Sequence, residues 1–245
     1  MGETNLGSIT IDGVGTYAGG EYDVVSISGK GTISSDLSCN MFTTSGSSKV
    51  CGKMKCSVLK SSGTCKIEGT LEAEEMSTSG TFQSLDDIKA DHIQSNGMLT
   101  ARSHVRGTKI ESNGTIYVEK NLSAEEFILN GMLTCNGDLN SEKVSMTLVG
   151  TSKVSEIGGS TIRIEPKTEF IGVIGRIFMP KRFHENMIIV DSIEGDSIYV
   201  ENCQAGRING GTVIVGPGCT IGSVEYSEEL QIHESSVVEQ YSKKE

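Results

Sequence analysis

The chain has 245 residues, 36% of them hydrophobic and only 5% aromatic, and its 32 Asp and Glu against 21 Lys and Arg give a formal net charge of −11 at pH 7. This charge excludes nucleic acid as an expected partner, because binding to phosphates relies on clustered Lys and Arg. No run approaches the ~20 apolar residues of a membrane-spanning helix, and the start is unlike a signal peptide, so we expect a cytoplasmic protein.

Residues 1–28 follow the pattern of the later chain only loosely. Val14, Gly20, Tyr22 and Val25 take the third, ninth, eleventh and fourteenth positions of the repeat that follows. Terminal repeats of stacked proteins are often atypical. We therefore predict an N-terminal capping coil over residues 1–28.

A 17-residue repeat runs through residues 29–147. Counted from its first residue, position 9 is apolar, position 11 is small and position 14 is large and apolar in every period, while positions 3 and 5 are mostly apolar. A fixed period of this kind indicates stacked structural repeats. Each of the seven periods opens on a glycine: Gly29, Gly46, Gly63, Gly80, Gly97, Gly114 and Gly131.

The spacing within one period predicts three short strands. Positions 3 and 5, and positions 9 and 11, alternate as strand residues do, and position 14 stands alone. Stacking such coils about 4.8 Å apart pairs each strand with its equivalents in the neighbouring coils. The sequence thus predicts an all-β fold, a three-sided parallel β-helix of 17-residue coils. Ser, Asn or Thr ends each period, at position 17, and we expect positive backbone angles at these corners.

The pattern drifts after residue 147 and then returns. Residues 148–186 are predicted to form an irregular joint, because Pro166, Pro180 and three phenylalanines give part of this stretch a composition unlike the coils. Alternating apolar residues with steps of 15 or 16 predict a second β-helix stack over residues 187–238. The polar residues 239–245 are expected to form a frayed tail. The three phenylalanines are Phe170, Phe178 and Phe183.

No catalytic, cofactor or metal site is predicted, and we do not expect an enzyme. The four histidines lie far apart, and the seven cysteines show neither CxxC spacing nor a balanced disulfide framework. Cys39 and Cys56 share position 11 and are expected to be core neighbours. Gly211–Gly218 lacks the Lys-Ser/Thr of a phosphate loop and is interpreted as a turn. A surface ladder of exposed ion pairs is expected at position 10, from Lys55, Glu72 and Lys89.

The sequence resembles the bactofilins, polymer-forming cytoskeletal proteins of bacteria. The resemblance rests on Ile27–Ile33 (ISGKGTI) before the glycine-headed coils, on Gly195–Val200 (GDSIYV), and on Val213–Ile221 (VIVGPGCTI) with Val224–Tyr226. It implies a right-handed β-helix that assembles end to end into filaments without nucleotide. It also implies a scaffold, with other bactofilins or membrane-associated proteins as partners and a place at the inner face of the membrane through them. This chain departs from the family's short form in its two stacks and polar start, which argue against direct membrane binding.

Both ends of a β-helix present unpaired strand edges and apolar core residues that need a cap or a partner. We therefore expect assembly with a second copy of the chain through the first and last coils. Two alternatives remain: a monomeric module that binds a protein partner through its outer faces, and a carbohydrate-active β-helix enzyme. The candidate assembly residues are Val14, Tyr22, Val25, Leu230, Ile232 and Val237.

Overall fold

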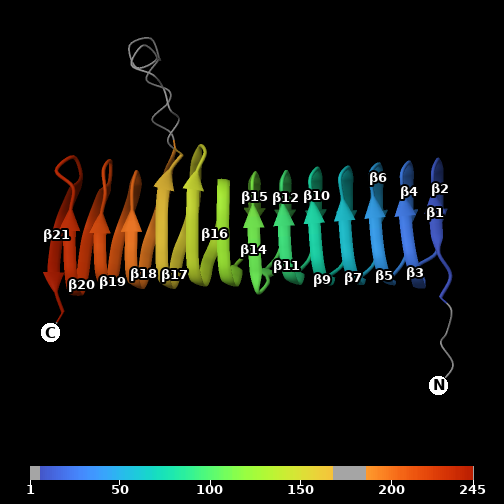
Figure 1. The fold of residues 1–245 in the computed structure, drawn as a ribbon, viewed down its shortest axis with the longest axis horizontal. Helices are drawn as coiled ribbons and strands as arrows, with labels where there is room; N and C mark the ends of the chain where they lie inside the picture. Colours follow the sequence, from blue (N-terminus) through green and yellow to red (C-terminus); the bar gives the residue numbers. More distant parts are fainter. Residues whose placement is uncertain (1–5, 168–185, 245) are drawn as a thin grey trace, which may run out of the picture. The chain divides into compact units, whose positions relative to one another are not determined.

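A computed structural model describes residues 6–167 and 186–244; residues 1–5, 168–185 and 245 lie outside this description. Over the described ranges the only regular elements are β-strands (Figure 1). They divide into two compact units, unit 1 over residues 1–124 and unit 2 over residues 125–245.

Unit 1 contains short strands that alternate with longer ones. They are β1 (Ile9–Ile11), β2 (Val14–Tyr17), β3 (Gly20–Ile27), β4 (Lys30–Ile33), β5 (Leu37–Thr44), β6 (Ser47–Val50), β7 (Met54–Ser61), β8 (Thr64–Ile67), β9 (Leu71–Thr78), β10 (Thr81–Ser84), β11 (Ile88–Ser95), β12 (Met98–Ala101), β13 (Val105–Arg106), β14 (Lys109–Ser112) and β15 (Thr115–Val118). β16 (Leu122–Leu148) begins in unit 1. Unit 2 continues with β17 (Thr151–Pro166), β18 (Met187–Val200), β19 (Cys203–Val215), β20 (Thr220–Ile232) and β21 (Val237–Lys243).

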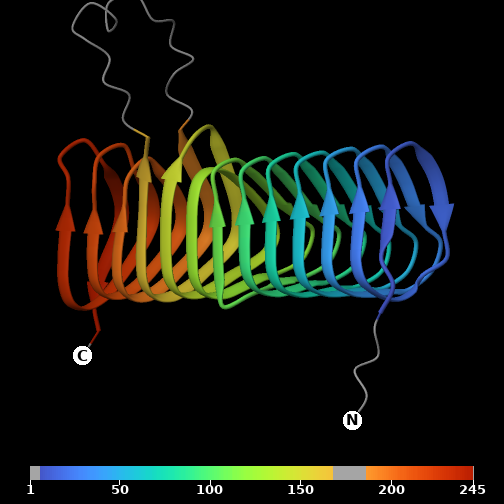
Figure 2. The same cartoon turned by 45° about the vertical axis from the view of Figure 1, so that its right-hand side comes forward.

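In unit 1 each strand pairs in parallel with its equivalent one coil later, and the chain winds around a common interior (Figure 2). Leu37 pairs with Met54 and Met54 with Leu71, which is the 17-residue step of the repeat. The pairing of β5 with β7 skips Asn40, so each eight-residue strand bends and supplies two sides of the coil. The predicted right-handed, three-sided parallel β-helix is confirmed.

The interior of unit 1 has a sixth inward position that the sequence pattern did not reveal. Besides positions 3, 5, 9, 11 and 14, position 16 is buried in five successive coils. Its side chains are small and polar, so position 14 does not stand alone. The residues at position 16 are Thr44, Ser61, Thr78, Ser95 and Ser112.

Part of this hydroxyl ladder lacks hydrogen-bond partners. Thr78 Oγ1 donates to Ser95 Oγ at 3.2 Å, but the hydroxyls of Thr44, Ser61 and Ser112 have no partner in the described structure. A buried polar group without a hydrogen bond costs about 1–3 kcal/mol. Replacing one of these unpartnered hydroxyls by an apolar group of the same shape should therefore stabilise the protein.

Thr44→Val is expected to raise the free energy of unfolding by about 1 kcal/mol. Valine has nearly the shape of threonine, favours strands, and removes a hydroxyl that is 4% exposed and unpartnered. Urea denaturation would measure the change. Thr78→Val is the matched control, because it breaks the existing bond to Ser95 and should not stabilise the protein.

Six of the seven repeat glycines do not have the positive φ that we expected of them, and Gly131, with a φ of 159°, is close to extended backbone. Positive φ among the described glycines occurs elsewhere, for example at Gly150 and Gly218. The repeat glycines are required for space instead. A Cβ atom on Gly63 or Gly80 would lie 2.0 Å from the carbonyl oxygen of the glycine one coil earlier.

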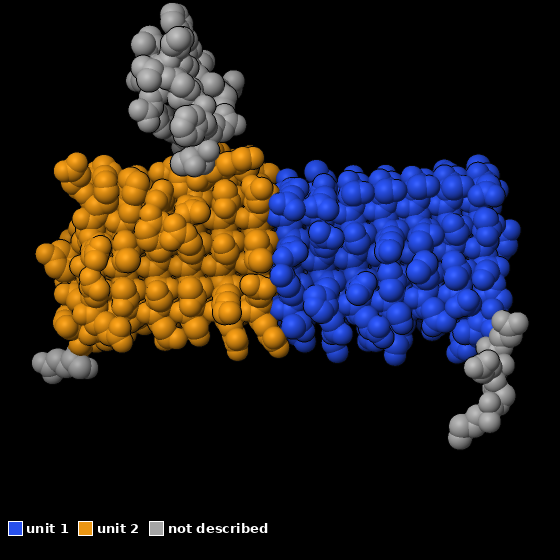
Figure 3. Space-filling view, viewed as in Figure 1, with its two compact units in different colours: residues 1–124 blue, residues 125–245 orange. Residues whose placement is uncertain are grey.

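In unit 2 (orange in Figure 3) the strands from β16 to β21 pair in parallel, each with the next. Residues 151–166 were expected to belong to an irregular joint, but they form β17, which pairs with β16 on one side and β18 on the other. Val154, Ile157 and Ile162 are buried and continue the core. The prediction of a joint over residues 148–186 is therefore wrong for this part.

The rest of the predicted joint, including Pro180 and the three phenylalanines, lies outside the described residues. The polar tail also needs correction. Val237–Lys243 forms β21, which pairs with β20 from Thr220↔Val237 to Tyr226↔Lys243. Backbone pairing with the preceding coil holds these residues, although most of their side chains are exposed.

Candidate functional site

Among the described residues, the last coil of unit 2 carries exposed side chains at core positions. Val215 and Val224 are buried in β19 and β20, whereas their register partners Ile232 and Tyr241 are 38% and 63% exposed. Leu230 pairs with the buried Val213 and is half-buried. Among the described residues β21 is the last strand and pairs with β20 alone (Figure 1). This end of unit 2 therefore exposes an apolar core section beside a strand edge.

The first coil of unit 1 is shifted by one residue relative to the repeat. Val14 pairs with Lys30, a step of 16 residues, and therefore lies on the outer face, where it is 87% exposed. A one-residue change of register moves a side chain to the other face of a strand. Tyr17, which pairs with the buried Ile33, occupies the core position instead.

Two tyrosine rings lie beside glycines in the first coil of unit 1. A Cβ on Gly15 would lie 3.2 Å from the ring of Tyr17, and a Cβ on Gly20 would lie 3.7 Å from the ring of Tyr22. The Tyr22 hydroxyl also donates to the carbonyl oxygen of Ala18 at 3.4 Å. The aromatic rings thus cover space that the glycines leave open.

The six candidate assembly residues differ in how far they are buried and in which way they face. Val25 is fully buried between its register partners Ile9 and Phe42, so its assignment to an exposed end is wrong. Tyr22 is half-buried, as is Leu230. Val237 is 57% exposed but faces outward, because it pairs with the exposed Thr220.

Sequence reasoning missed Tyr17 and Tyr241. A signal was available, since tyrosines are scarce in this chain and these two lie in the terminal coils. Their register, which the 17-residue frame does not give at either end, decides that they take core positions.

Exposed large apolar side chains concentrate on the terminal coils. Among the described residues nine such side chains are exposed, and five of them lie on the first coil of unit 1 or the last coil of unit 2. The other four, Met41, Leu85, Met98 and Val149, are scattered along the sides, as is normal for a protein surface. The five are Val14, Tyr17, Ile232, Val237 and Tyr241.

Acidic groups accompany the apolar side chains at both ends. Residues 6–28 contain Asp12, Glu21 and Asp23 but neither Lys nor Arg. The last coil has two lysines, and both are engaged nearby: Lys244 Nζ lies 3.2 Å from Glu225, and Lys243 Nζ donates to the carbonyl oxygen of Glu228. Each end therefore carries negative charge.

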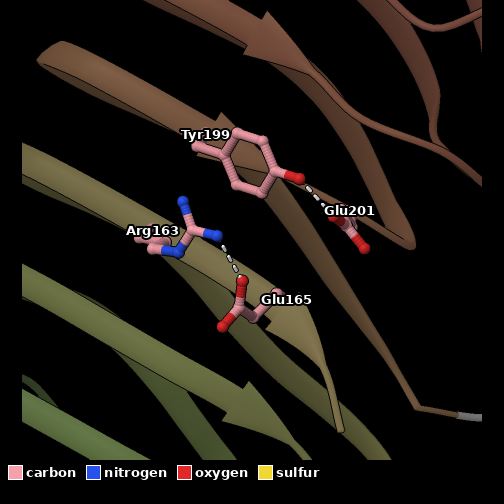
Figure 4. Close-up of polar contacts among 4 residues, drawn as sticks. All are labelled: Arg163, Glu165, Tyr199 and Glu201. Carbon is pink, nitrogen blue, oxygen red and sulfur yellow. Dashed lines mark hydrogen bonds and ion pairs between the residues drawn. The ribbon is translucent and has the colours of Figure 1, made fainter. Parts of the chain in front are cut away.

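Away from the ends, a cluster of four polar side chains joins β17 to β18 on the outside of unit 2 (Figure 4). The Arg163 guanidinium lies 4.3 Å from the centre of the Tyr199 ring and 2.6 Å from Glu165. The Tyr199 hydroxyl donates to Glu201, and this bond raises the pKa of Tyr199. The polar groups of this cluster bind one another. We therefore interpret the cluster as a set of contacts that stabilises the pairing of two coils and not as a catalytic site.

Among the described residues, no three or more His, Cys, Asp or Glu side chains lie together so that they could hold a metal ion. Nor do residues 6–167 and 186–244 include a helix with the length and apolarity needed to cross a membrane.

The chain is similar to two proteins of Bacillus subtilis (strain 168). It is 36% identical to YhbF over 108 residues, which are 44% of this chain and 42% of that protein. It is 31% identical to YhbE over 108 residues, which are 44% of this chain and 43% of that protein. Both are described as uncharacterized, and the chain spans less than half the length of each. No family model and no solved structure matches the chain.

Proposed function

We propose that the protein is a bactofilin-like scaffold that assembles end to end with copies of itself, without nucleotide, and positions other cellular components. The uncovered core section at the last coil of unit 2, with Ile232 and Tyr241 exposed at core positions, carries the proposal. A second copy that stacks on this end would bury these side chains and pair with the edge of β21.

The alternatives receive less support. A binding module would use the sides of the coils, where the exposed apolar side chains are scattered. A carbohydrate-active enzyme would need a pair of carboxylates free to act on a sugar, and the pair Glu165 and Glu201 on β17 and β18 is engaged by Arg163 and Tyr199. The carboxylates that line a groove of unit 1, among them Glu72, Glu74 and Asp91, share it with Lys55 and Lys89.

Negative-stain microscopy and sedimentation velocity of the purified chain, without nucleotide, test this function. We expect filaments that become longer as the NaCl concentration rises from 0.05 to 0.5 M. Over this range the screening length for charges falls to a few ångströms. The filaments should lengthen because screening weakens the repulsion between the acidic groups at both ends, while apolar burial is not weakened by salt. A monomer under every condition would contradict the proposal and favour a binding module.

A further inference from the structure

Two free thiols lie one above the other in unit 1. Cys39 of β5 and Cys56 of β7 are register partners in adjacent parallel strands. Cys39 is 7% exposed and Cys56 is 5% exposed. The 17-residue period places both at position 11, so their side chains point the same way from coils about 4.8 Å apart.

Both thiols line a groove on the outside of unit 1. Its volume is about 430 Å³, and Tyr22 and Ala73 contribute to it beside the two cysteines. The charged side chains that line it are four carboxylates and two lysines: Glu21, Glu72, Glu74, Asp91, Lys55 and Lys89. The groove gives a small solute access to sulfur atoms that are otherwise covered.

The spacing suits an ion between the sulfurs better than a direct bond. A disulfide brings the two Cβ atoms to about 3.8 Å, less than the coil spacing. Ions that require three or four ligands are disfavoured, because the described residues offer no such donor group. Cu(I) is a soft ion that prefers thiolate ligands, and it forms stable complexes with as few as two of them.

We propose that Cys39 and Cys56 bind one Cu(I) ion as a two-thiolate site in this groove. Each thiol loses its proton to solvent and forms one S–Cu bond, and the copper remains Cu(I). The acidic lining of the groove attracts the Cu(I) cation, and Lys55 and Lys89 are the cations in the same walls that the one negative charge of the resulting site attracts.

Proton release gives the site a characteristic pH dependence. Burial raises the pKa of Cys39 to about 11 and that of Cys56 to about 12, with Cys39 and Cys65 adding to the effect on Cys56. Both thiols are therefore protonated at pH 7, and binding releases two protons. Affinity for Cu(I) should rise roughly 100-fold per pH unit between pH 6 and 8.

Anaerobic competition with bicinchoninate, using Cu(I) alone as the probe, tests the site. The wild type should take one Cu(I) per chain, and Cys39→Ser or Cys56→Ser should weaken binding at least 100-fold. The matched control is Cys203→Ser with Cys219→Ser. These two precede the register partners Gln204 and Thr220, so they are also stacked, but they are only 1% and 2% exposed. The control should bind as the wild type does.

Release of two protons per Cu(I) by the wild type provides a second readout that needs no variant. It also separates thiols from methionine sulfur, which releases none. Equal copper uptake by the wild type and the folded Cys39→Ser and Cys56→Ser variants, or no proton release, would overturn the proposal.

Discussion

Gly63→Ala is expected to lower the free energy of unfolding by about 3 kcal/mol or more. A Cβ at this residue would lie 2.0 Å from the carbonyl oxygen of Gly46 and 2.6 Å from that of Ser45. Both atoms belong to the backbone, and the Gly46 oxygen accepts the hydrogen bond of Thr64 N at 2.9 Å. Relief of the clash therefore requires two coils to separate, which costs more than an ordinary overpacked side chain.

Gly13→Ala is the matched control, because nothing lies within 4 Å of a Cβ at that glycine. Thermal and urea denaturation should show a change of at most about 1 kcal/mol for the control, in the stabilising direction. Equal losses in the two variants would mean that general glycine flexibility, and not close approach between coils, explains the repeat.

The sequence predicted most of the fold of unit 1 because five inward positions carry apolar or small side chains in a fixed frame. It missed position 16, where residues such as Thr44 and Ser95 face inward although their hydroxyls are typical of a surface. Because the residues at position 16 are polar, the sequence did not indicate that this side of the coil faces the interior. The corner glycines were found but misinterpreted, since composition does not distinguish a positive φ from close contact between backbones.

Unit 2 was harder to predict because its coils differ in length. Ile188 pairs with Cys203 and Ala205 with Ile221, steps of 15 and 16 residues, whereas Asp138 pairs with Glu156 at a step of 18. Because the step between paired residues changes from coil to coil, equivalent positions do not recur at a fixed interval in the sequence, as they do in the 17-residue repeat. The same cause explains the errors at the ends, where the register of Val14 and Tyr241 depends on the pairing of single strands.

Ile232→Glu combined with Tyr241→Glu is expected to abolish the proposed end-to-end assembly. Burial of an isoleucine and a tyrosine against a second copy is worth several kcal/mol, and a buried unpaired carboxylate opposes it. We expect the protein concentration needed for assembly to rise at least 100-fold, as measured by sedimentation velocity. Glutamate is chosen because lysine would be attracted to the acidic ends and confuse the result.

Met98→Glu is the control for this pair, since Met98 is 49% exposed on the side of unit 1 and should not affect assembly. The two end residues are themselves 38% and 63% exposed, so the double variant should keep its strand content and thermal midpoint. Assembly that survives the double variant with the fold intact would exclude this end as the contact. Assembly lost equally in Met98→Glu would instead place the contact on the sides of the coils, where scattered apolar residues would join parallel copies.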